Sequence, residues 1–570
     1  MSVELIAGIE LAYAERSDLL VLALTGRTGS GCTTTSNVLC REYSDISLAI
    51  DELEGLDARK IGIVNQFAKV KWRPFTRITV STVILSYVMG LEWGELETFL
   101  NLKKIKPVIV QAMKKIHSDL RGDVRYLVFF ECMKEPEKQN SSEAWKFFRD
   151  VLEPAGKEVK NIFAGWYAPI FQTFGDNLRC SGNPISEKID PKSLFSLIRR
   201  VKILSKAAFY EARQSGKESA HIVIDAIRNP LELVYLRDQF AAFYAIAITT
   251  SEKNRQSRLI NSGLYTSRDI EAIDAKEYSN KSLDKYENFV SQNIQECIQK
   301  SDLFITNPGD SREFEQCVDL NRQVVKYVSL MLRPGLVTPT RDERCMQLAF
   351  VAKLNSGCIS RQVGAAVADR NYSIRSVGWN DVPKGQVSCL LRSVNSLLSN
   401  NDAVAFSDYE KNDRQLRDHL GSKFANRGTL ESADGLKCPF CFKDAYNKMK
   451  DEKNQVHTRS LHAEENAFLQ LAKSGGAGVD GGALYTTASP CELCSKKAYQ
   501  LGIKEIIFVD PYPGISESHI LGSGELGYRP VLRLFGGAVG HAYHRLYDPL
   551  LPIKDEYAVR LTVNPQTSFL

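Results

Sequence analysis

Residues 460–494 read SLHAEENAFLQLAKSGGAGVDGGALYTTASPCELC, and this stretch decides how the C-terminal half of the chain folds. His462 opens it, and a Pro-Cys-Glu-Leu-Cys segment later supplies Cys491 and Cys494. One imidazole and two thiolates suit Zn²⁺, with the fourth position left for water. Sites with three protein ligands are normally catalytic, because the metal lowers the pKa of water at its open position. We therefore predict a catalytic zinc site here.

The residues around these ligands favour proton transfer and a suitable local structure. Glu464 follows the histidine closely enough to exchange a proton with that water without binding the metal. Residues 461–473 have a helix-forming composition, residues 483–486 are expected to form a strand, and a second helix is expected from Pro490 onward. The three ligands then lie at helix N-termini, where the dipole favours thiolates. A purely structural zinc site is the alternative, and the position of Glu464 argues against it.

Length and composition indicate a globular protein with several domains. A chain of 570 residues is too long for one core, so two or three domains are expected. A net charge of +5 permits a phosphorylated substrate but does not indicate a nucleic-acid-binding surface. The 13 cysteines lack a disulfide pattern and favour a reduced, cytoplasmic protein. The first residues lack the pattern of a signal peptide, and no apolar run is long enough to span a membrane.

A glycine-rich loop near the start of the chain follows a predicted buried strand. Leu19–Thr25 is a continuous apolar run, and Gly26-Arg27-Thr28-Gly29-Ser30-Gly31-Cys32-Thr33 comes directly after it, before a helix-forming stretch. In this setting a GxxxxGK[ST] loop binds phosphate through its backbone N–H groups. The expected phosphate-binding residues are Gly26, Gly29, Gly31 and Thr33. Cys32 replaces the motif lysine, which favours binding over phosphoryl transfer. A glycine turn that serves only packing is the alternative.

Two later apolar segments extend this pattern. Residues 221–227 contain Asp225 near the end of a predicted strand, and residues 243–249 form another strand that precedes Arg255 and Arg258. With the glycine loop, they resemble the P-loop nucleoside-phosphate kinases. That resemblance implies that Asp225 lies near a metal or substrate and that the paired arginines contact phosphates from a lid.

A second region begins after a segment rich in proline and glycine, Arg333-Pro334-Gly335-Leu336-Val337-Thr338-Pro339, which is the best candidate for a domain boundary. Thr340-Arg341-Asp342-Glu343 then has the pattern of a capping box. The helix that follows should bury an apolar face at Cys345, Leu348, Ala349 and Ala352. Residues 363–368 and 374–379 are expected to form a β-hairpin.

Several of these segments together resemble the deoxycytidylate deaminases: Ser360-Arg361-Gln362-Val363-Gly364-Ala365, Gly378-Trp379-Asn380-Asp381-Val382-Pro383, and the HAE and PCELC motifs. The resemblance implies a cytidine-deaminase-like α/β/α domain that hydrolyses the amino group at C4 of cytosine. It makes Glu464 the acid and base of the reaction. It also places Asn380 at the sugar and assigns Ala463 to substrate binding.

A degraded P-loop domain joined to a deaminase resembles the bacterial antiphage cytidylate deaminases, which remove dCTP and dCMP during infection. The predicted α/β organisation is a P-loop kinase-like parallel-sheet domain at 1–330 with a helical insertion at about 100–215, a linker at 331–340 and a deaminase domain at 341–570. A homo-oligomer is expected, and an RNA or protein inhibitor is a candidate partner. The choice between dCMP and dCTP stays open. The rival hypotheses are a housekeeping dCMP deaminase, an editing deaminase acting on tRNA or single-stranded DNA, and a nucleotide sensor.

A polar segment at 386–459, expected to be mostly exposed helix, contains Cys438-Pro439-Phe440-Cys441. With Cys389 and His457 it is a candidate for a second, structural zinc site, with free thiols as the alternative. Further on, residues 504–509 are expected to be a core strand. The loop Asp510-Pro511-Tyr512-Pro513-Gly514 is expected beside the substrate pocket.

Overall fold

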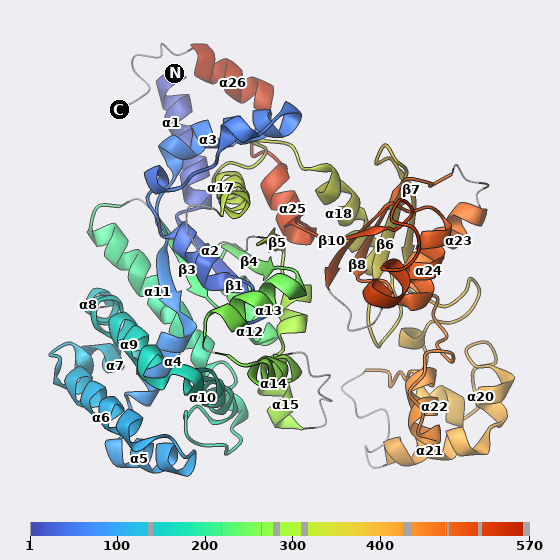
Figure 1. The fold of residues 1–570 in the computed structure, drawn as a ribbon, viewed down its shortest axis with the longest axis horizontal. Helices are drawn as coiled ribbons and strands as arrows, with labels where there is room; N and C mark the ends of the chain where they lie inside the picture. Colours follow the sequence, from blue (N-terminus) through green and yellow to red (C-terminus); the bar gives the residue numbers. More distant parts are fainter. Residues whose placement is uncertain are drawn as a thin grey trace. The chain divides into compact units, whose positions relative to one another are not determined.

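The computed structural model describes residues 2–134, 141–217, 219–263, 265–277, 285–308, 317–425, 436–473, 475, 478–510 and 516–562. It divides into two compact units (Figure 1). The N-terminal unit comprises Met1–Thr338 with His541–Leu570, and the C-terminal unit comprises Pro339–Gly540. Among the described residues, no helix is long and apolar enough to cross a bilayer.

The end of the chain groups with the N-terminal unit, whereas the sequence analysis placed it in the deaminase domain. The last helix, α26 (Ile553–Thr562), packs against the first, α1 (Ser2–Arg16). The Tyr13 hydroxyl donates a hydrogen bond to Glu556 at 3.1 Å, and Arg333 pairs with the same carboxylate at 2.7 Å. The buried carboxylate of Glu556 thus links the last helix to Tyr13 and Arg333, which explains why the end of the chain belongs to the N-terminal unit.

The N-terminal unit is built on parallel strands in the order β5-β4-β1-β3-β2. Their bounds are β1 (Leu19–Thr25), β2 (Thr76–Thr79), β3 (Ala220–Asp225), β4 (Ala242–Thr249) and β5 (Leu303–Thr306). Because the strands are parallel, their carboxyl ends meet at one edge, which brings the loop after β1 close to the ends of β3 and β4. The short β2 escaped prediction because its sequence, Thr-Arg-Ile-Thr, contains one apolar residue.

Helices surround this sheet and share one core with it. Those before residue 92 are α1, α2 (Cys32–Leu39), α3 (Gly55–Lys71) and α4 (Val80–Val88). The predicted helical region contains α5 (Trp93–Leu102), α6 (Pro107–Gly122), α7 (Tyr126–Lys134), α8 (Ser141–Phe147), α9 (Glu153–Phe163), α10 (Tyr167–Ser181) and α11 (Ser196–Gln214). Val21 and Ile222 of the strands belong to the same hydrophobic cluster as Phe129 and Trp145 of these helices. The helical region is therefore part of the main core of the unit.

The remaining helices of the N-terminal unit follow β3 in the sequence. They are α12 (Pro230–Gln239), α13 (Glu252–Asn261), α14 (Ser267–Glu277), α15 (Tyr286–Val290), α16 (Ile294–Gln299), α17 (Val318–Leu332), α25 (Gly540–Tyr547) and α26. In Figure 1, α13 and α14 lie in green near the labels of β1 and α12.

The C-terminal unit contains a mixed sheet in the order β10-β9-β8-β6-β7. The strands are β6 (Gly364–Ala368), β7 (Ile374–Trp379), β8 (Ala483–Ala488), β9 (Glu505–Asp510) and β10 (Val531–Leu534). The short β11 (Gly537–Ala538) follows β10 in the sequence but is not a strand of this sheet. β6 is antiparallel to β7 and β8, whereas β8, β9 and β10 are parallel. The predicted hairpin is confirmed. β10 was not predicted.

Helices cover both faces of this sheet. α18 (Arg341–Lys353) packs on one face and α23 (Ala463–Lys473) on the other, with α24 (Glu492–Gln500) beside α23. The approach is close: a Cβ on Gly364 would lie 2.0 Å from Ala349 O of α18, and one on Gly378 would lie 2.4 Å from Ala463 O of α23. The capping box is confirmed at Thr340 and Glu343. Leu348 was expected in the core but is 43% exposed.

The segment at 386–459 has a core of its own, which corrects the expectation of mostly exposed helix. It contains α19 (Val394–Leu398), α20 (Asp408–Asn412), α21 (Arg414–Ala425) and α22 (Phe442–Lys450). Arg392 is buried between Phe406 and Phe440, 4.8 Å from each ring centroid, and pairs with buried Glu410. A stacked and paired guanidinium of this kind organises the segment around one point.

Candidate metal and proton-transfer site

The three predicted metal ligands converge at the ends of two helices. His462 directly precedes α23, Cys491 is the N-cap residue of α24, and Cys494 lies in the first turn of α24. His462 Nδ1 is 3.3 Å from Cys491 Sγ and 3.6 Å from Cys494 Sγ. In the part of the chain that the structure describes, these residues form the one group of three such ligand atoms within 4.8 Å of one another. One nitrogen and two sulfur donors fit a zinc ion.

Backbone contacts fix the two segments that supply these ligands. Leu461 N donates to Asp381 O at 2.8 Å, which joins the residue before His462 to the loop after β7. The Ser516 hydroxyl donates to Pro490 O at 3.0 Å, which holds the residue before Cys491. The segments that carry the ligands are thus held by the loop after β7 and by the helical turn that begins at Ser516.

The side chains of the ligands stabilise one another electrostatically. The hydrogen bond from Cys494, with that of His462, lowers the pKa of Cys491 to about 3. A hydrogen bond with Cys491 raises the pKa of His462, and a second hydrogen bond with Cys491 raises the pKa of Cys494. Negative charge therefore concentrates on the sulfur of Cys491, whereas the raised pKa of Cys494 keeps its thiol protonated until a metal replaces the proton.

Glu464 lies in the first turn of α23 and is only 4% exposed. Burial raises the pKa of its carboxyl group. Its Oε1 atom lies 2.8 Å from the Thr486 hydroxyl, which is also 2.8 Å from Ala488 O. Sequence reasoning missed Thr486, although a hydroxyl residue at the end of the strand expected at 483–486, shortly before Pro490, could have suggested it.

Asn380 lies at the end of β7, where its side chain holds the backbone. Its Oδ1 accepts from Val363 N at 2.7 Å and from the Ser356 hydroxyl at 2.9 Å, and its Nδ2 donates to Arg361 O at 2.6 Å. Ala463, the other residue assigned to substrate, is fully buried as the first residue of α23.

A buried ion pair close to the cysteine loop was also missed. Arg361 pairs with Asp510, whose side chain has no exposed surface. Asp510 O accepts from Ser489 N at 2.9 Å, so this pair adjoins the residues before Cys491. The remaining part of the predicted loop, residues 511–515, lies outside the described residues.

The candidate ligands of a second zinc site do not converge on one point in the described structure. Among the described residues, Cys389, Cys438, Cys441 and His457 do not form a group of three ligand atoms within 4.8 Å. The His457 ring lies 4.4 Å from the Tyr446 ring, centroid to centroid. Burial first, and then the neighbouring sulfurs of Cys441 and Cys358, raise the pKa of Cys389 to about 11.

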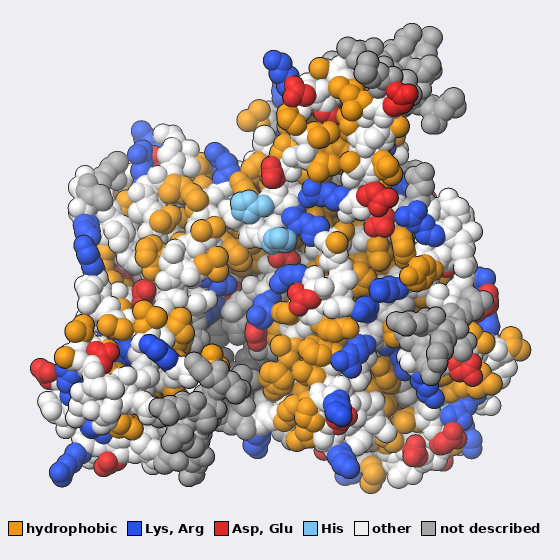
Figure 2. Space-filling model, turned by 180° about the vertical axis from the view of Figure 1, so that it is seen from behind, with side chains coloured by type: hydrophobic (Ala, Val, Ile, Leu, Met, Phe, Trp, Pro, Cys, Tyr) orange, Lys and Arg blue, Asp and Glu red, His pale blue; other side chains and the backbone are white. Residues whose placement is uncertain are grey.

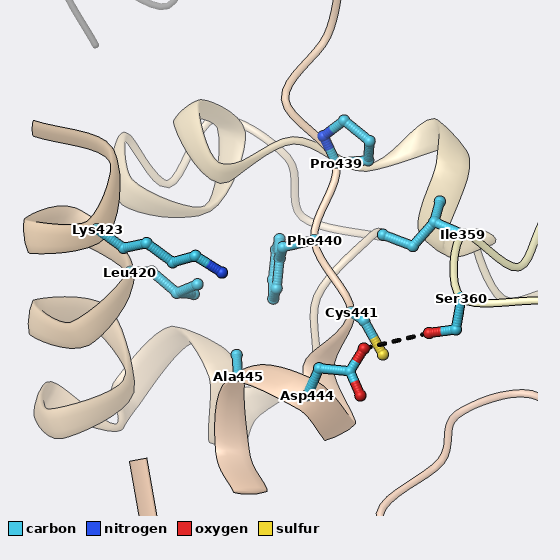
Figure 3. A pocket seen from close by; sticks show the side chains of 9 residues that line it. All are labelled: Ile359, Ser360, Leu420, Lys423, Pro439, Phe440, Cys441, Asp444 and Ala445. Atoms are coloured by element: carbon cyan, nitrogen blue, oxygen red, sulfur yellow. Dashed lines mark hydrogen bonds between the residues drawn. The ribbon is translucent and has the colours of Figure 1, made fainter. Parts of the chain in front are cut away.

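Cys441 lines a cavity of about 220 Å³ in the C-terminal unit (Figure 3). Ser360 lies on the facing segment, and its hydroxyl donates to Asp444 at 3.2 Å. Pro439, Phe440 and Lys423 also line this cavity. The Cys-x-x-Cys segment therefore reaches the residues just before β6.

The glycine loop of the N-terminal unit lies between β1 and α2. Gly29 and Gly31 have φ angles of +88° and +109°, which glycine adopts most readily. Thr33 lies in the first turn of α2, and Gly26 begins the loop. Asp225 ends β3 and is 8% exposed, and burial raises the pKa of its carboxyl group.

Comparisons with known proteins match the C-terminal unit. Residues 339–510 match the family model described as cytidine and deoxycytidylate deaminase zinc-binding region. The deoxycytidylate deaminase of Enterobacteria phage T4 is 29% identical over 167 residues, which are 29% of this chain and 76% of that protein. The deoxycytidylate deaminase of Schizosaccharomyces pombe is 28% identical over 183 residues, which are 32% of this chain and 41% of that protein.

Among solved structures, the dCMP deaminase from the cyanophage S-TIM5 in complex with dCMP and dUMP covers 35% of this chain and 99% of its own. It is 24% identical, and its TM-score of 0.21 is too low to compare the folds. The family model and the sequence relatives support the deoxycytidylate deaminase family, and the chain is a hydrolytic deaminase.

Proposed function

We propose that the protein hydrolyses deoxycytidine nucleotides, converting dCMP, dCTP or both to dUMP or dUTP with release of ammonia. The observation that carries this proposal is the buried Glu464 beside the group formed by His462, Cys491 and Cys494. The relatives named deoxycytidylate deaminase support the choice of a deoxycytidine nucleotide as substrate.

The residues of the chain divide the chemistry among them. His462, Cys491 and Cys494 would hold a zinc ion, which lowers the pKa of water and so supplies a nucleophile near neutral pH. Glu464 takes a proton from the attacking water and delivers it to N3 of the base. It then takes the second proton, from the hydroxyl group now bonded to C4, and delivers it to the amino group, which departs as ammonia. Because Glu464 is buried, its neutral and charged forms lie closer in free energy than those of an exposed carboxyl group. Thr486 fixes the orientation of the carboxyl group.

We propose that the biological role is antiphage defence in the cytoplasm, through depletion of the dCTP pool. We also propose that the protein acts as a homo-oligomer and that an RNA or a protein can inhibit it. Housekeeping supply of dUMP is the first alternative, and editing of tRNA or single-stranded DNA is the second. On the face drawn in Figure 2, the described Lys and Arg side chains alternate with acidic and apolar ones, which favours a small substrate over a nucleic acid.

The test is to measure ammonia release from dCMP, dCTP, CMP and a cytosine-containing oligonucleotide. Turnover of dCMP and dCTP supports nucleotide depletion. Turnover of dCMP alone supports the housekeeping alternative, and turnover of the oligonucleotide alone contradicts the proposed substrate class.

We further propose that the N-terminal unit is P-loop kinase-like and binds a nucleotide that regulates the deaminase. Its parallel sheet and glycine loop support this proposal. Asn307 Nδ2 donates to Ser30 O at 3.0 Å, which ties the loop to the residue after β5. Half-buried Cys32, whose pKa burial raises to about 12, brings no positive charge. Added ATP should change the rate of dCMP turnover, and a rate that no nucleotide alters contradicts this part.

We also propose a structural zinc that binds the cysteines of the segment at 386–459 after they move together, with Cys358, whose sulfur lies near Cys389, as a further ligand; in this structure the described cysteines do not form a group of three ligand atoms within 4.8 Å. Leu390 N donates to Gly357 O, and Val394 N donates to Cys438 O, each at 3.0 Å. These bonds support an approach of the segments that carry Cys358, Cys389 and Cys438. His457, packed on Tyr446, is then not required as a ligand.

A further inference from the structure

Two helices of the N-terminal unit cover its glycine loop directly. A Cβ on Gly29 would lie 2.8 Å from Leu259 Cγ of α13. Arg255 of α13 donates to Thr28 O at 3.1 Å, and Arg258 donates to Ser30 O at 3.3 Å. The loop is therefore covered by α13.

The carboxylate of Glu277, at the end of α14, occupies donors of this loop. It accepts from Thr28 N at 3.2 Å and from the Thr28 hydroxyl. Arg228 adds a third donor, with Nη1 at 2.6 Å from Glu277 Oε1. The Glu277 side chain has no exposed surface. A backbone N–H, a hydroxyl and a guanidinium are the donors that bind a phosphate oxygen in proteins.

Carboxylates of the same two helices also neutralise the neighbouring arginines. Asp274 of α14 pairs with Arg27 at 2.9 Å and with Arg255 at 2.6 Å. Glu252 of α13 pairs with Arg255 at 2.6 Å and also with Arg27. The cations that could attract a polyphosphate are thus already paired within the protein.

We propose that Glu277 stands in the place of a ligand phosphate, so that a polyphosphate binds the glycine loop only by displacing Glu277 and lifting α14. This inference rests on the proposed nucleotide binding by the N-terminal unit and adds its regulation. Because Cys32 replaces the lysine of the motif, no lysine helps a ligand phosphate to compete with Glu277. The Glu277 carboxylate therefore keeps the loop closed at low ligand concentration. The ligand class is the polyphosphate group shared by free pyrophosphate and nucleoside triphosphates.

The test is calorimetric titration of the full-length protein with pyrophosphate and, separately, with ATP. Glu277→Gln keeps the shape of the side chain, removes its charge and releases Arg228 for the ligand. We expect this variant to bind pyrophosphate about 10- to 100-fold more tightly than the wild type. Glu271→Gln is the matched control, because Glu271 is exposed on the same helix, and it should bind as the wild type does. ATP binding that is tighter than pyrophosphate binding identifies a nucleotide as the source of the polyphosphate.

A second measurement on the wild type keeps the test independent of the folding of the variant. Hydrogen–deuterium exchange in residues 267–277 should rise when pyrophosphate saturates the loop, because α14 loses its anchor. If the wild type and Glu277→Gln bind pyrophosphate equally and exchange in residues 267–277 falls on binding, the proposed displacement of Glu277 is wrong, although the phosphate site stands. Absence of binding in both overturns the displacement and the nucleotide site together, while the deaminase proposal stands.

Discussion

The Thr486 hydroxyl lies 2.8 Å from Glu464 Oε1 and 2.8 Å from Ala488 O. A hydroxyl group carries one proton, so it donates to only one of these two oxygens at a time. When Glu464 is protonated, it can donate to Thr486, which then donates to the carbonyl. When Glu464 is ionised, Thr486 can turn its proton toward the carboxylate. The threonine therefore serves both states of the residue that is proposed to transfer protons.

Thr486→Val should lower kcat for dCMP about 10- to 100-fold, because a hydrogen bond to a charged group contributes about 1.5–3 kcal/mol. Bound zinc, measured by mass spectrometry, should not change. Thr486→Ser restores the hydroxyl and should recover most of the activity. Equal activity in the valine and serine variants would show that the hydrogen bond has no part in turnover.

Gly378 is where β7 and α23 come closest, since an added Cβ would lie 2.4 Å from both Ala463 O and Ala467 N. Gly378→Ala should destabilise the C-terminal unit by about 1–3 kcal/mol through overpacking and should weaken zinc binding by shifting the start of α23. Gly478→Ala is the control, because nothing lies within 4 Å of its added Cβ. Urea denaturation and zinc content measure both effects. A Gly378→Ala protein as stable as the control contradicts this packing.

His221 is buried beside Phe75, with ring centroids 5.1 Å apart, and burial lowers its pKa from 6.5 to about 4. Between these values the unfolded chain takes up a proton that the folded chain does not. Neutral, buried His221 therefore makes its full contribution to the free energy of unfolding above about pH 6.5. That contribution, about 3 kcal/mol, is lost as the pH falls toward 4.

Urea denaturation at pH 7.5 and pH 5 should show a smaller loss of stability in His221→Gln than in the wild type, since glutamine does not titrate. His541→Gln, at an exposed position, should behave as the wild type does. The same pH dependence in all three proteins would rule out His221 as the titrating group.

The proposed structural zinc predicts two zinc ions per chain by mass spectrometry. Cys441→Ser should remove one ion and spare ammonia release from dCMP, whereas Cys491→Ser should remove the other and abolish it. The metal-free segment should also unfold more readily, because metal binding contributes folding free energy. A wild-type stoichiometry of one, unchanged in Cys441→Ser, refutes the second site.

The sequence predicted the parts of the fold that local patterns encode. Continuous apolar runs located β1 and β4, and the ligand spacing located His462, Cys491 and Cys494, which lie on adjacent helix ends. Leu348 was misplaced because helical periodicity shows which residues share a face but not how far the sheet covers that face.

Long-range contacts were out of reach of sequence patterns. The link between Tyr13 and Glu556 joins the two ends of the chain, and no local pattern predicts it. The segment at 386–459 was expected to be exposed because it is polar. Its Arg392 is in fact buried between two phenylalanines, and a paired and stacked arginine cannot be recognised before its partners are known. Glu277 escaped notice for the same reason.

The central claim is that Glu464 transfers protons in a hydrolytic deamination, and ammonia release from dCMP by zinc-loaded Glu464→Gln tests it most directly. The control is Glu465→Gln, at the adjacent position, where the carboxylate pairs with Lys497. We predict a loss of at least about 10²–10⁴-fold for Glu464→Gln with zinc content unchanged, and near-normal activity for Glu465→Gln. Substantial activity in Glu464→Gln, or an equal loss in both variants, would contradict the account.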